Sequence, residues 1–226
     1  MSATGEGRSR AEPPSAILFD WDNTLIDGWA AIQAGLNAAF AAFGKPAWSR
    51  EQVLANVRKS LRDSFPEHFG DEWECARDIF YEAVRSTHLE VIAPLPGTIP
   101  MLDAAAHLPL GIVSNKQGPL LREEARHLGW DARFRAVIGA GDALADKPSG
   151  LPLELCLTRM GLSAGPHIWY VGDTGVDMQA ARAAGCRAVL LGDAAHDGGV
   201  AALGPDLHFG DGLALARWLG ALDKGG

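Results

Sequence analysis

The sequence of 226 residues is 47% hydrophobic and carries 28 acidic against 20 basic side chains, which gives a formal net charge of −8. This length and apolar content can bury a sizeable core, as one domain with an insertion or as two small domains. The acidic balance argues against nucleic acid and anionic membranes as partners, because both bind basic surfaces.

Residues 1–14 begin the chain with a polar segment that is rich in Ser, Gly, Arg and Glu and ends in Pro13-Pro14. The segment contains too few apolar residues to pack, so we expect a mobile tail. It lacks the apolar stretch of a signal peptide, and no run elsewhere approaches the length of a membrane helix. We therefore expect a cytoplasmic protein with no membrane partner.

An apolar run at residues 16–19 ends in two carboxylates, Asp20 and Asp22, with one residue between them. The run predicts a buried strand, and in open parallel α/β sheets reactive groups collect beyond the carboxyl ends of the strands. Two neighbouring acids repel each other unless a cation, a proton or backbone donors compensate, which favours a functional pair. An Asx turn, in which Asp22 and Asn23 bond their own backbone, explains this stretch alone equally well.

The next stretch, residues 28–94, has a helical pattern throughout, with apolar residues recurring every three or four positions. The expected helices are 29–43, a second one that opens at the capping-box pattern Ser49 to Gln52 and has an apolar face reaching Leu61, and a third from about Asp71. We expect Phe65-Pro66 to interrupt the second of these. Residues 28–94 are thus predicted to form a small all-helical cap domain, inserted after the first strand of a core domain made of residues 15–27 and 95–226.

From residue 98 onward, short apolar runs alternate with helical segments. The expected strands are 110–113, 136–138, 168–171, 188–191 and 207–209. The expected helices are 98–108, 119–128, 152–160, 176–184 and 212–219. Alternation of this kind with short connections implies a parallel sheet covered by helices on both faces. The sequence therefore predicts an α/β fold with a Rossmann-like parallel sheet.

Polar groups follow the predicted strands at several points. They are Asp20 and Asp22, then Ser114-Asn115-Lys116, then Asp146-Lys147-Pro148, and finally Gly172-Asp173-Thr174-Gly175-Val176-Asp177. Taken singly, each has an ordinary explanation, because Ser114 or Asp173 could cap a helix and Lys147 could be a solvated surface charge. The carboxyl ends of parallel strands share one edge, however, so the order of these groups favours a single site.

Four segments resemble the four ordered motifs of the haloacid dehalogenase superfamily: Asp20-Trp21-Asp22-Asn23-Thr24, Ser114-Asn115, Lys147-Pro148 and Gly172-Asp173-Thr174-Gly175-Val176-Asp177. The helical insertion between the first two is similar to the first-position cap of phosphoglycolate phosphatase-like members. The resemblance extends from about residue 15 to the end of the chain. It is specific for the superfamily and much less informative about the substrate.

The resemblance implies a magnesium-dependent phosphatase that acts on a small-molecule phosphate ester. By similarity, Asp20 attacks phosphorus to give an aspartyl-phosphate, while Asp22 protonates the leaving oxygen and later takes a proton from water. Members of the superfamily bind the metal through the side chains at the Asp20 and Asp173 positions and the backbone carbonyl at the Asp22 position. Such oxygen ligands suit Mg²⁺, which would offset the repulsion between the acids and the phosphate.

The resemblance also implies roles for five further residues. Ser114 and Lys147 resemble the residues that hold the phosphoryl oxygens, and Asn115 and Thr24 are expected to support them. Asp177 is expected to act behind the metal ligands, through water or by orienting Lys147.

Several alternatives remain beside this interpretation. A phosphomutase or pyrophosphatase of the same fold needs the same acids. Members that dehalogenate or cleave phosphonates lack some of the acids found at Asp22, Asp173 and Asp177. A phospho-accepting signalling domain is roughly half as long and has no helical insertion, and a binding protein without turnover would not need the intact acids.

The cap is expected to set specificity, and its candidate residues are Arg58 and Arg62, which lie four residues apart on one helix. This pair could meet a second anionic group of the substrate, although a solvated helix face explains it as well. Phosphoglycolate, a sugar phosphate, a nucleotide and pyrophosphate all remain open as substrates, and so does the oligomeric state.

Overall fold

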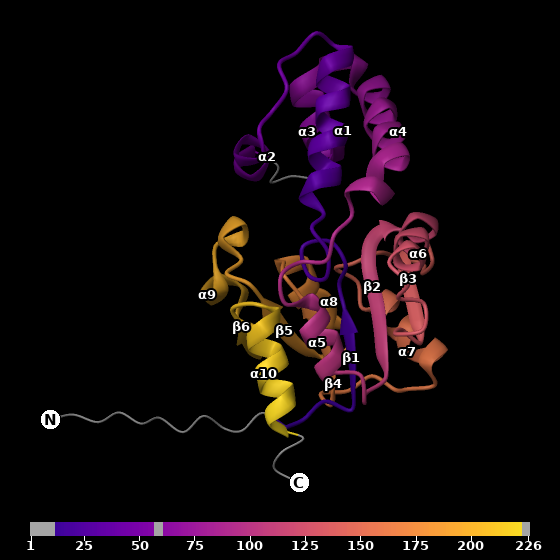
Figure 1. Ribbon diagram of the computed structural model, residues 1–226, viewed down its shortest axis with the longest axis vertical. Helices are drawn as coiled ribbons and strands as arrows, with labels where there is room; N and C mark the ends of the chain where they lie inside the picture. Colours follow the sequence, from indigo (N-terminus) through magenta and orange to yellow (C-terminus); the bar gives the residue numbers. More distant parts are fainter. Residues whose placement is uncertain (1–11, 57–60, 223–226) are drawn as a thin grey trace, which may run out of the picture.

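The computed structural model describes residues 12–56 and 61–222 and is built around one parallel sheet (Figure 1). Its strands are β1 (Ala16–Phe19), β2 (Leu110–Gln117), β3 (Ala136–Ala140), β4 (Ile168–Gly172), β5 (Arg187–Leu191) and β6 (Leu207–Phe209). They lie in the order β3-β2-β1-β4-β5-β6, and every pair is parallel. The chain thus builds one half of the sheet outward from β1 and then returns to build the other half from β4.

Helices cover both faces of this sheet, as the alternating pattern predicts. One face packs against α5 (Thr98–Ala104), α6 (Gly118–His127) and α10 (Gly212–Leu222), and the other against α7 (Leu151–Met160) and α8 (Gly175–Ala183). Successive residues of β1 point to opposite faces, because Ile17 belongs to the first apolar cluster and Leu18 to the second. A strand that is buried on both faces has a continuous run of apolar residues, as β1 does. The parallel sheet with helices on both faces confirms the predicted α/β fold.

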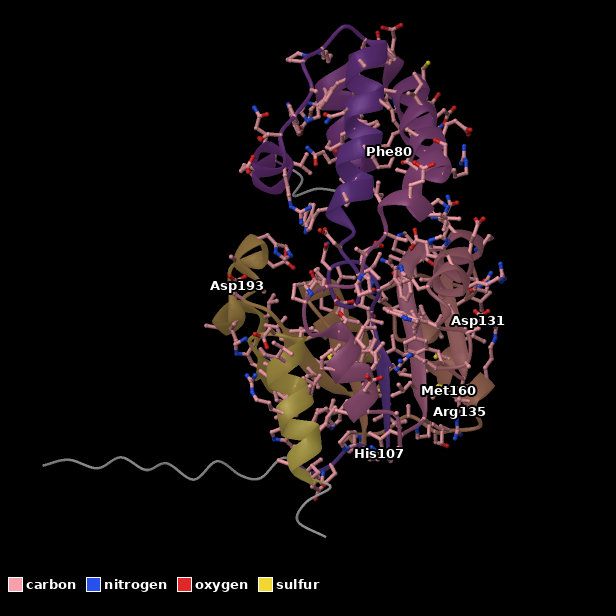
Figure 2. The ribbon with its side chains drawn as sticks, viewed as in Figure 1. Phe80, His107, Asp131, Arg135, Met160 and Asp193 are labelled. Atoms are coloured by element: carbon pink, nitrogen blue, oxygen red, sulfur yellow. The ribbon has the colours of Figure 1, made fainter. Side chains whose placement is uncertain are left out.

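Four further helices lie beyond the carboxyl edge of the sheet, at the top of Figure 1. They are α1 (Trp29–Ala42), α2 (Arg50–Asn56), α3 (Leu61–Phe69) and α4 (Trp73–Val91). These helices have an apolar cluster of their own, in which Phe80 of α4 (Figure 2) contacts the Phe65 ring of α3, with 5.7 Å between the ring centroids. The exact bounds of a cap domain at residues 28–94 stay a prediction.

The expected interruption at Phe65-Pro66 is wrong, because Pro66 lies inside α3. A proline in a helix interior costs about 3 kcal/mol, through one lost hydrogen bond and a steric clash. Phe65 and Phe69 are buried at 0% and 7% exposure, and burying a phenylalanine contributes about 1.5–3 kcal/mol. Two such side chains outweigh the proline, whose own ring faces outward.

Other boundaries also differ from those expected. The second strand continues past residue 113 to Gln117, so Ser114 and its two neighbours lie within β2. The helix expected over 98–108 ends at Ala104, and α4 begins at Trp73 after a 3₁₀ turn at Gly70–Glu72. A second 3₁₀ turn at Ala195–Asp197 and a short helix, α9 (Val200–Leu203), were not expected. The predicted second cap helix is described from Arg50 to Asn56, and residues 57–60 lie outside the described part of the chain.

Among the helices that the structure describes, none combines the length and the apolar character needed to cross a membrane. Of the predicted tail, only residues 12–14 fall within the described part of the chain.

Candidate active site

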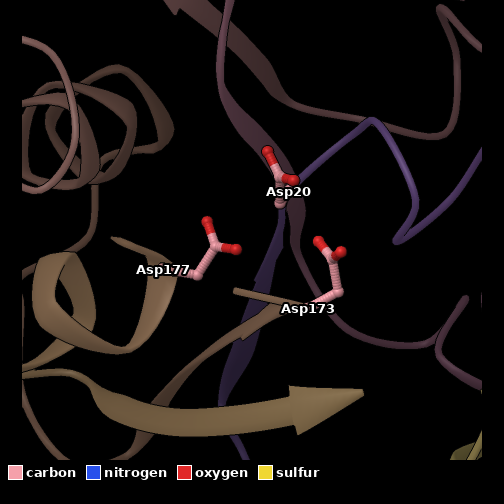
Figure 3. Close-up of side chains that lie close together, drawn as sticks. All are labelled: Asp20, Asp173 and Asp177. Atoms are coloured by element: carbon pink, nitrogen blue, oxygen red, sulfur yellow. The ribbon is translucent and has the colours of Figure 1, made fainter. Parts of the chain in front are cut away.

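Three carboxylates converge at the carboxyl edge of the sheet, where β1 and β4 lie side by side (Figure 3). Asp20 follows β1, Asp173 follows β4, and Asp177 lies in the first turn of α8. One oxygen from each lies within 4.8 Å of the others. In open α/β sheets this point, where the order of strands reverses, is where ligands bind. Residues 153 positions apart in sequence are therefore brought together by strand pairing alone.

Lys147 is the cation that faces these acids. Its Nζ donates to Asp20 Oδ1 at 2.7 Å, to Asp177 Oδ1 at 2.7 Å and to the Tyr170 hydroxyl at 2.9 Å. Burial opposes the charge of this ammonium, but Asp177 and Asp20 outweigh that effect and raise the pKa of Lys147. The side chain is 4% exposed, so all three of its protons are directed at fixed protein partners.

The cluster holds more negative than positive charge. Burial raises the pKa of Asp20 to about 6 although Lys147 counteracts it, and burial together with Asp20 and Asp177 raises the pKa of Asp173 well above its usual range. Desolvation acts in the same direction on Asp177, but Lys147 overrides it and lowers the pKa of that carboxyl. Three carboxylates thus face one ammonium. This excess and the all-oxygen donor set fit a small divalent cation held by Asp20 and Asp173.

Thr24 and Asn115, which the sequence analysis expects as supporting residues, contact neighbouring residues of the site. Thr24 Oγ1 donates to Asp173 Oδ1 at 3.2 Å. The Asn115 side chain forms a reciprocal pair with the backbone of Lys147, donating to its carbonyl and accepting from its N–H, both at 2.9 Å. Both contacts orient groups of the cluster, so any contact of Thr24 or Asn115 with phosphate stays a prediction.

Asp177 is fixed by its position at the start of α8. Its carboxylate accepts from the backbone N–H of Thr174 at 3.0 Å and from the Thr174 hydroxyl at 2.6 Å, as in a capping box. The other oxygen accepts from Lys147. Asp177 is therefore placed to orient Lys147, one of the two roles expected for it.

A cavity of about 440 Å³ opens beside the cluster, between the sheet edge and the upper helices. Its floor includes Asp20, Asp22, Ser114, Lys147 and Asp173. Its opposite wall comes from α1 and α4 and consists of Ala31, Ile32, Phe80, Tyr81, Val84 and Arg85. The space is large enough for a small organic molecule whose phosphate would lie at the floor.

The carboxylate of Asp22 accepts a hydrogen bond from the side chain of Lys116. The alternative of an Asx turn, in which this carboxylate would bond its own backbone, therefore does not apply to Asp22. Lys116 Nζ donates to Asp22 Oδ1 at 2.9 Å and to both oxygens of Glu124, at 2.8 and 2.7 Å. The sequence analysis placed Lys116 in one of the polar groups without giving it a role, and it did not identify Glu124 or Tyr170 as site residues. A signal existed for Glu124, which stands on the apolar face of α6 beside Leu121.

The two cap arginines cannot be compared with the structure, because Arg58 and the side chain of Arg62 lie outside the described residues. Within the described residues, the cation on the cap side of the cavity is Arg85 of α4. Its guanidinium contacts Glu82 Oε2 at 2.8 Å.

Comparison with known proteins agrees with this architecture. A family model described as haloacid dehalogenase-like hydrolase matches residues 17–191. A phosphoglycolate phosphatase of Xanthomonas campestris is 34% identical over 184 residues, covering 78% of this chain and 82% of its own. One of Chromobacterium violaceum is 31% identical over 204 residues, covering 85% and 90%. A haloacid dehalogenase-like family hydrolase from Streptococcus pneumoniae shares the fold, with a TM-score of 0.78 at 22% identity over 91% of this chain and 98% of that one. The chain therefore belongs to the haloacid dehalogenase-like hydrolases.

Proposed function

We propose that this hydrolase is a magnesium-dependent phosphatase that cleaves a small phosphomonoester through an aspartyl-phosphate on Asp20. The observation that supports this most is the cluster of Asp20, Asp173 and Asp177 around Lys147 at the floor of a cavity. Phosphoryl transfer depends chiefly on positioning and charge stabilisation, and this cluster offers both.

Asp20 and Asp22 have different roles in the first step, as nucleophile and as general acid. The Asp20 carboxylate attacks phosphorus, and the ester oxygen departs with a proton from Asp22. In the second step Asp22 takes a proton from the attacking water, and the Asp20 carboxylate is regenerated as phosphate leaves. A bound Mg²⁺ would supply positive charge to the phosphoryl oxygens beside Asp20 and Asp173.

Lys147 and Ser114 are proposed to hold the phosphoryl oxygens. Lys147 already contacts Asp20 at 2.7 Å, so its charge lies next to the oxygen that attacks. Ser114 is 5% exposed and lines the cavity floor from β2, where its hydroxyl can reach a phosphate placed over Asp20. Both groups stabilise negative charge that grows as the ester bond breaks.

The substrate class we infer is an alkyl phosphate with a second anionic group, for which phosphoglycolate is the first candidate. Relatives at 34% and 31% identity are named phosphoglycolate phosphatases. The cavity carries Arg85 on the wall opposite the acids, and an arginine suits a carboxylate. Arg58 and Arg62 stay predictions for the same task. Phosphomutase and pyrophosphatase activity use the same acids, and no contact in the described residues favours either over hydrolysis.

A panel of phosphomonoesters, assayed with Mg²⁺ and again with a chelator, tests this function. Phosphate release should require Mg²⁺ and should be abolished by Asp20→Asn, which removes the attacking oxygen with little change in volume. The control is Asp131→Asn, because Asp131 is a surface carboxylate with a 65% exposed side chain (Figure 2). Turnover by Asp20→Asn within a few-fold of the wild-type rate would contradict the proposal.

A further inference from the structure

Glu124 is a buried carboxylate with a complete set of partners. It lies on α6 and is 1% exposed. One oxygen, Oε1, accepts from Lys116 Nζ at 2.8 Å and contacts His88 Nδ1 at 2.9 Å. The other, Oε2, accepts from Lys116 Nζ at 2.7 Å and from Trp21 Nε1 at 2.6 Å. Because a carboxylate only accepts, the His88 nitrogen that faces it is the one that carries hydrogen.

Two of these partners determine where Asp22 lies. Trp21 is the residue immediately before Asp22, and its indole is fully buried against Glu124 and Trp130. Lys116 contacts the Asp22 side chain directly, at 2.9 Å. Glu124 therefore holds the backbone of Asp22 through Trp21 and its carboxylate through Lys116.

The remaining partner, His88, comes from the upper helices. It lies in the last turn of α4, is 2% exposed, and contacts Glu124 from the cap side of the cavity. The same helix contributes Phe80, Tyr81, Val84 and Arg85 to the cavity wall. Glu124 thus connects α4, which forms part of the cavity wall, to Asp22, the residue proposed as acid and base.

A gain in stability does not explain well why Glu124 and Lys116 form a buried ion pair. Removing two charges from water costs several kcal/mol per ion, and well-packed apolar side chains of similar volume often stabilise a protein as well or better. The face of α6 that bears Glu124 is otherwise formed by Gly118, Leu121 and Ala125, where an apolar residue would fit the pattern. A buried polar network in which every member is satisfied fixes one geometry, and that is what a group transferring protons requires.

We propose that Glu124 is a positioning residue for Asp22, which it holds through Lys116 and Trp21 and connects to the cap through His88. In the wild-type enzyme, Lys116 shares its charge between Glu124 and Asp22, so the Asp22 carboxylate stays directed into the cavity. Without Glu124, Lys116 loses two of its three hydrogen bonds, and the indole of Trp21 loses its acceptor. This inference rests on the proposed function, because it assigns a use to Asp22.

The test compares Glu124→Gln with Glu123→Gln. Glu123 is the neighbouring acid on α6, has a 53% exposed side chain and approaches only the far nitrogen of His88, at 3.7 Å. First-turnover rates are measured with Mg²⁺ on two probes, the best alkyl phosphate of the panel and p-nitrophenyl phosphate. The aryl probe has a good leaving group and needs little help from an acid. Asp22→Asn is measured in parallel as the reference for loss of the acid.

Glu124→Gln should lower the first-turnover rate for the alkyl phosphate about 10- to 100-fold, the usual effect of a misplaced catalytic group, while the substrate concentration that gives half of the maximal rate stays unchanged. The aryl phosphate should lose much less, as it does in Asp22→Asn, and Glu123→Gln should behave as wild type on both probes. His88→Gln should also slow the alkyl phosphate more than the aryl phosphate, but by a smaller factor than Glu124→Gln. Equal losses on both probes, or no loss, would assign Glu124 a merely structural role and overturn the inference.

Crystal structures of the two glutamate variants give a readout independent of turnover. The Asp22 carboxylate should leave its wild-type position, together with Lys116 Nζ, in Glu124→Gln and keep it in Glu123→Gln, and an unchanged Asp22 in both would overturn the inference. If the wild-type protein hydrolyses no phosphomonoester, or if Asp22→Asn does not distinguish the probes, the proposed function fails. The crystal structures would still decide whether Glu124 holds Asp22.

Discussion

The hydroxyl of Tyr170, on β4, lies beside the acidic cluster and connects it to β2, which β1 separates from β4. It accepts from Lys147 Nζ at 2.9 Å and donates to the backbone carbonyl of Val113 at 2.7 Å. Burial together with Asp177 and Asp20 raises the pKa of Tyr170, so the phenol keeps its proton. The tyrosine therefore supports the ammonium of Lys147 without adding negative charge to a site that already has an excess.

Replacing Tyr170 with Phe should lower the free energy of unfolding by about 1–3 kcal/mol, the cost of leaving buried polar groups without a partner. The Val113 carbonyl and one proton of Lys147 would lose their contact while the ring volume stays almost the same. Denaturant unfolding measures the change. The only other tyrosine, Tyr81 on α4, is half-buried and gives the matched control. A smaller loss in Tyr170→Phe than in Tyr81→Phe would contradict this role.

Asp20 makes the stability of the metal-free protein depend on pH. Its pKa rises from a usual 3.8 to about 6 in the folded state, chiefly through burial. The folded state then binds more protons than the unfolded state between these values, so stability falls as pH rises from about 4 to 6. A shift of this size corresponds to up to about 3 kcal/mol.

Unfolding by denaturant at pH 4.5 and pH 7, in chelator, measures this dependence. The Asp20→Asn variant should lose part of the pH dependence, because it removes the titrating group. The same slope in wild type and variant would show that other groups account for it.

At the scale of elements, the start of α1 approaches the site so closely that only glycine fits. A Cβ on Gly28, the residue that precedes α1, would lie 2.6 Å from Asp22 Oδ1 and 2.9 Å from Asp22 Cβ. Side chains essentially never approach so closely, so either α1 or Asp22 would have to move. The entry of the chain into the upper helices and the position of Asp22 are therefore coupled.

Gly28→Ala should lower turnover of an alkyl phosphate about tenfold or more by displacing Asp22, with a small effect on the thermal unfolding midpoint. The control is Gly220→Ala in α10, where an added Cβ meets no atom within 4 Å. Steady-state kinetics and thermal unfolding of both variants measure the effects. Wild-type kinetics in Gly28→Ala would mean that the segment adjusts without moving Asp22.

For the whole molecule, the main electrostatic feature is the excess negative charge at the point where the two halves of the sheet meet. Asp20 and Asp173 come from opposite sides of this division, so a cation that binds both joins the halves. Binding to the folded state alone stabilises a protein by about 2.7 kcal/mol at a ligand concentration one hundred times Kd. For a chain of this size, that energy corresponds to a midpoint rise of about 5–10 °C.

Mg²⁺ should therefore raise the thermal unfolding midpoint of the wild-type protein at pH 7. Asp173→Asn should abolish this rise and should also stabilise the metal-free protein, because it removes a carboxylate whose ionisation burial and its neighbours oppose. Asp193→Asn, at a loop acid away from the cluster, should respond to Mg²⁺ as wild type does (Figure 2). An equal Mg²⁺ shift in both variants would exclude Asp173 as a ligand.

Local patterns in the sequence predicted those features that a few neighbouring residues decide. Alternation of apolar runs with helical segments predicted the strands and most helices, because burial of a face leaves a period of two or of three to four residues. Ser49 and Gln52 predicted a capping box, and their side chains and backbones do pair reciprocally, at 2.8 and 3.3 Å. The bounds failed where packing overrode local preference, as at Pro66.

The fold class and the order of the acids could be predicted from the sequence, because strands of one parallel sheet place their carboxyl ends at a common edge. Which side chains pair across that edge became visible in the folded structure. Asp22 and Lys116 are separated by 94 residues, and Trp21 and Glu124 by 103. The local periodicity of the sequence does not indicate contacts over such distances, since they depend on how α6 packs against β2 and β3 and on where α4 ends. The partners of the acids at Asp20 and Asp22 thus follow from packing, while the acids themselves are visible in the chain.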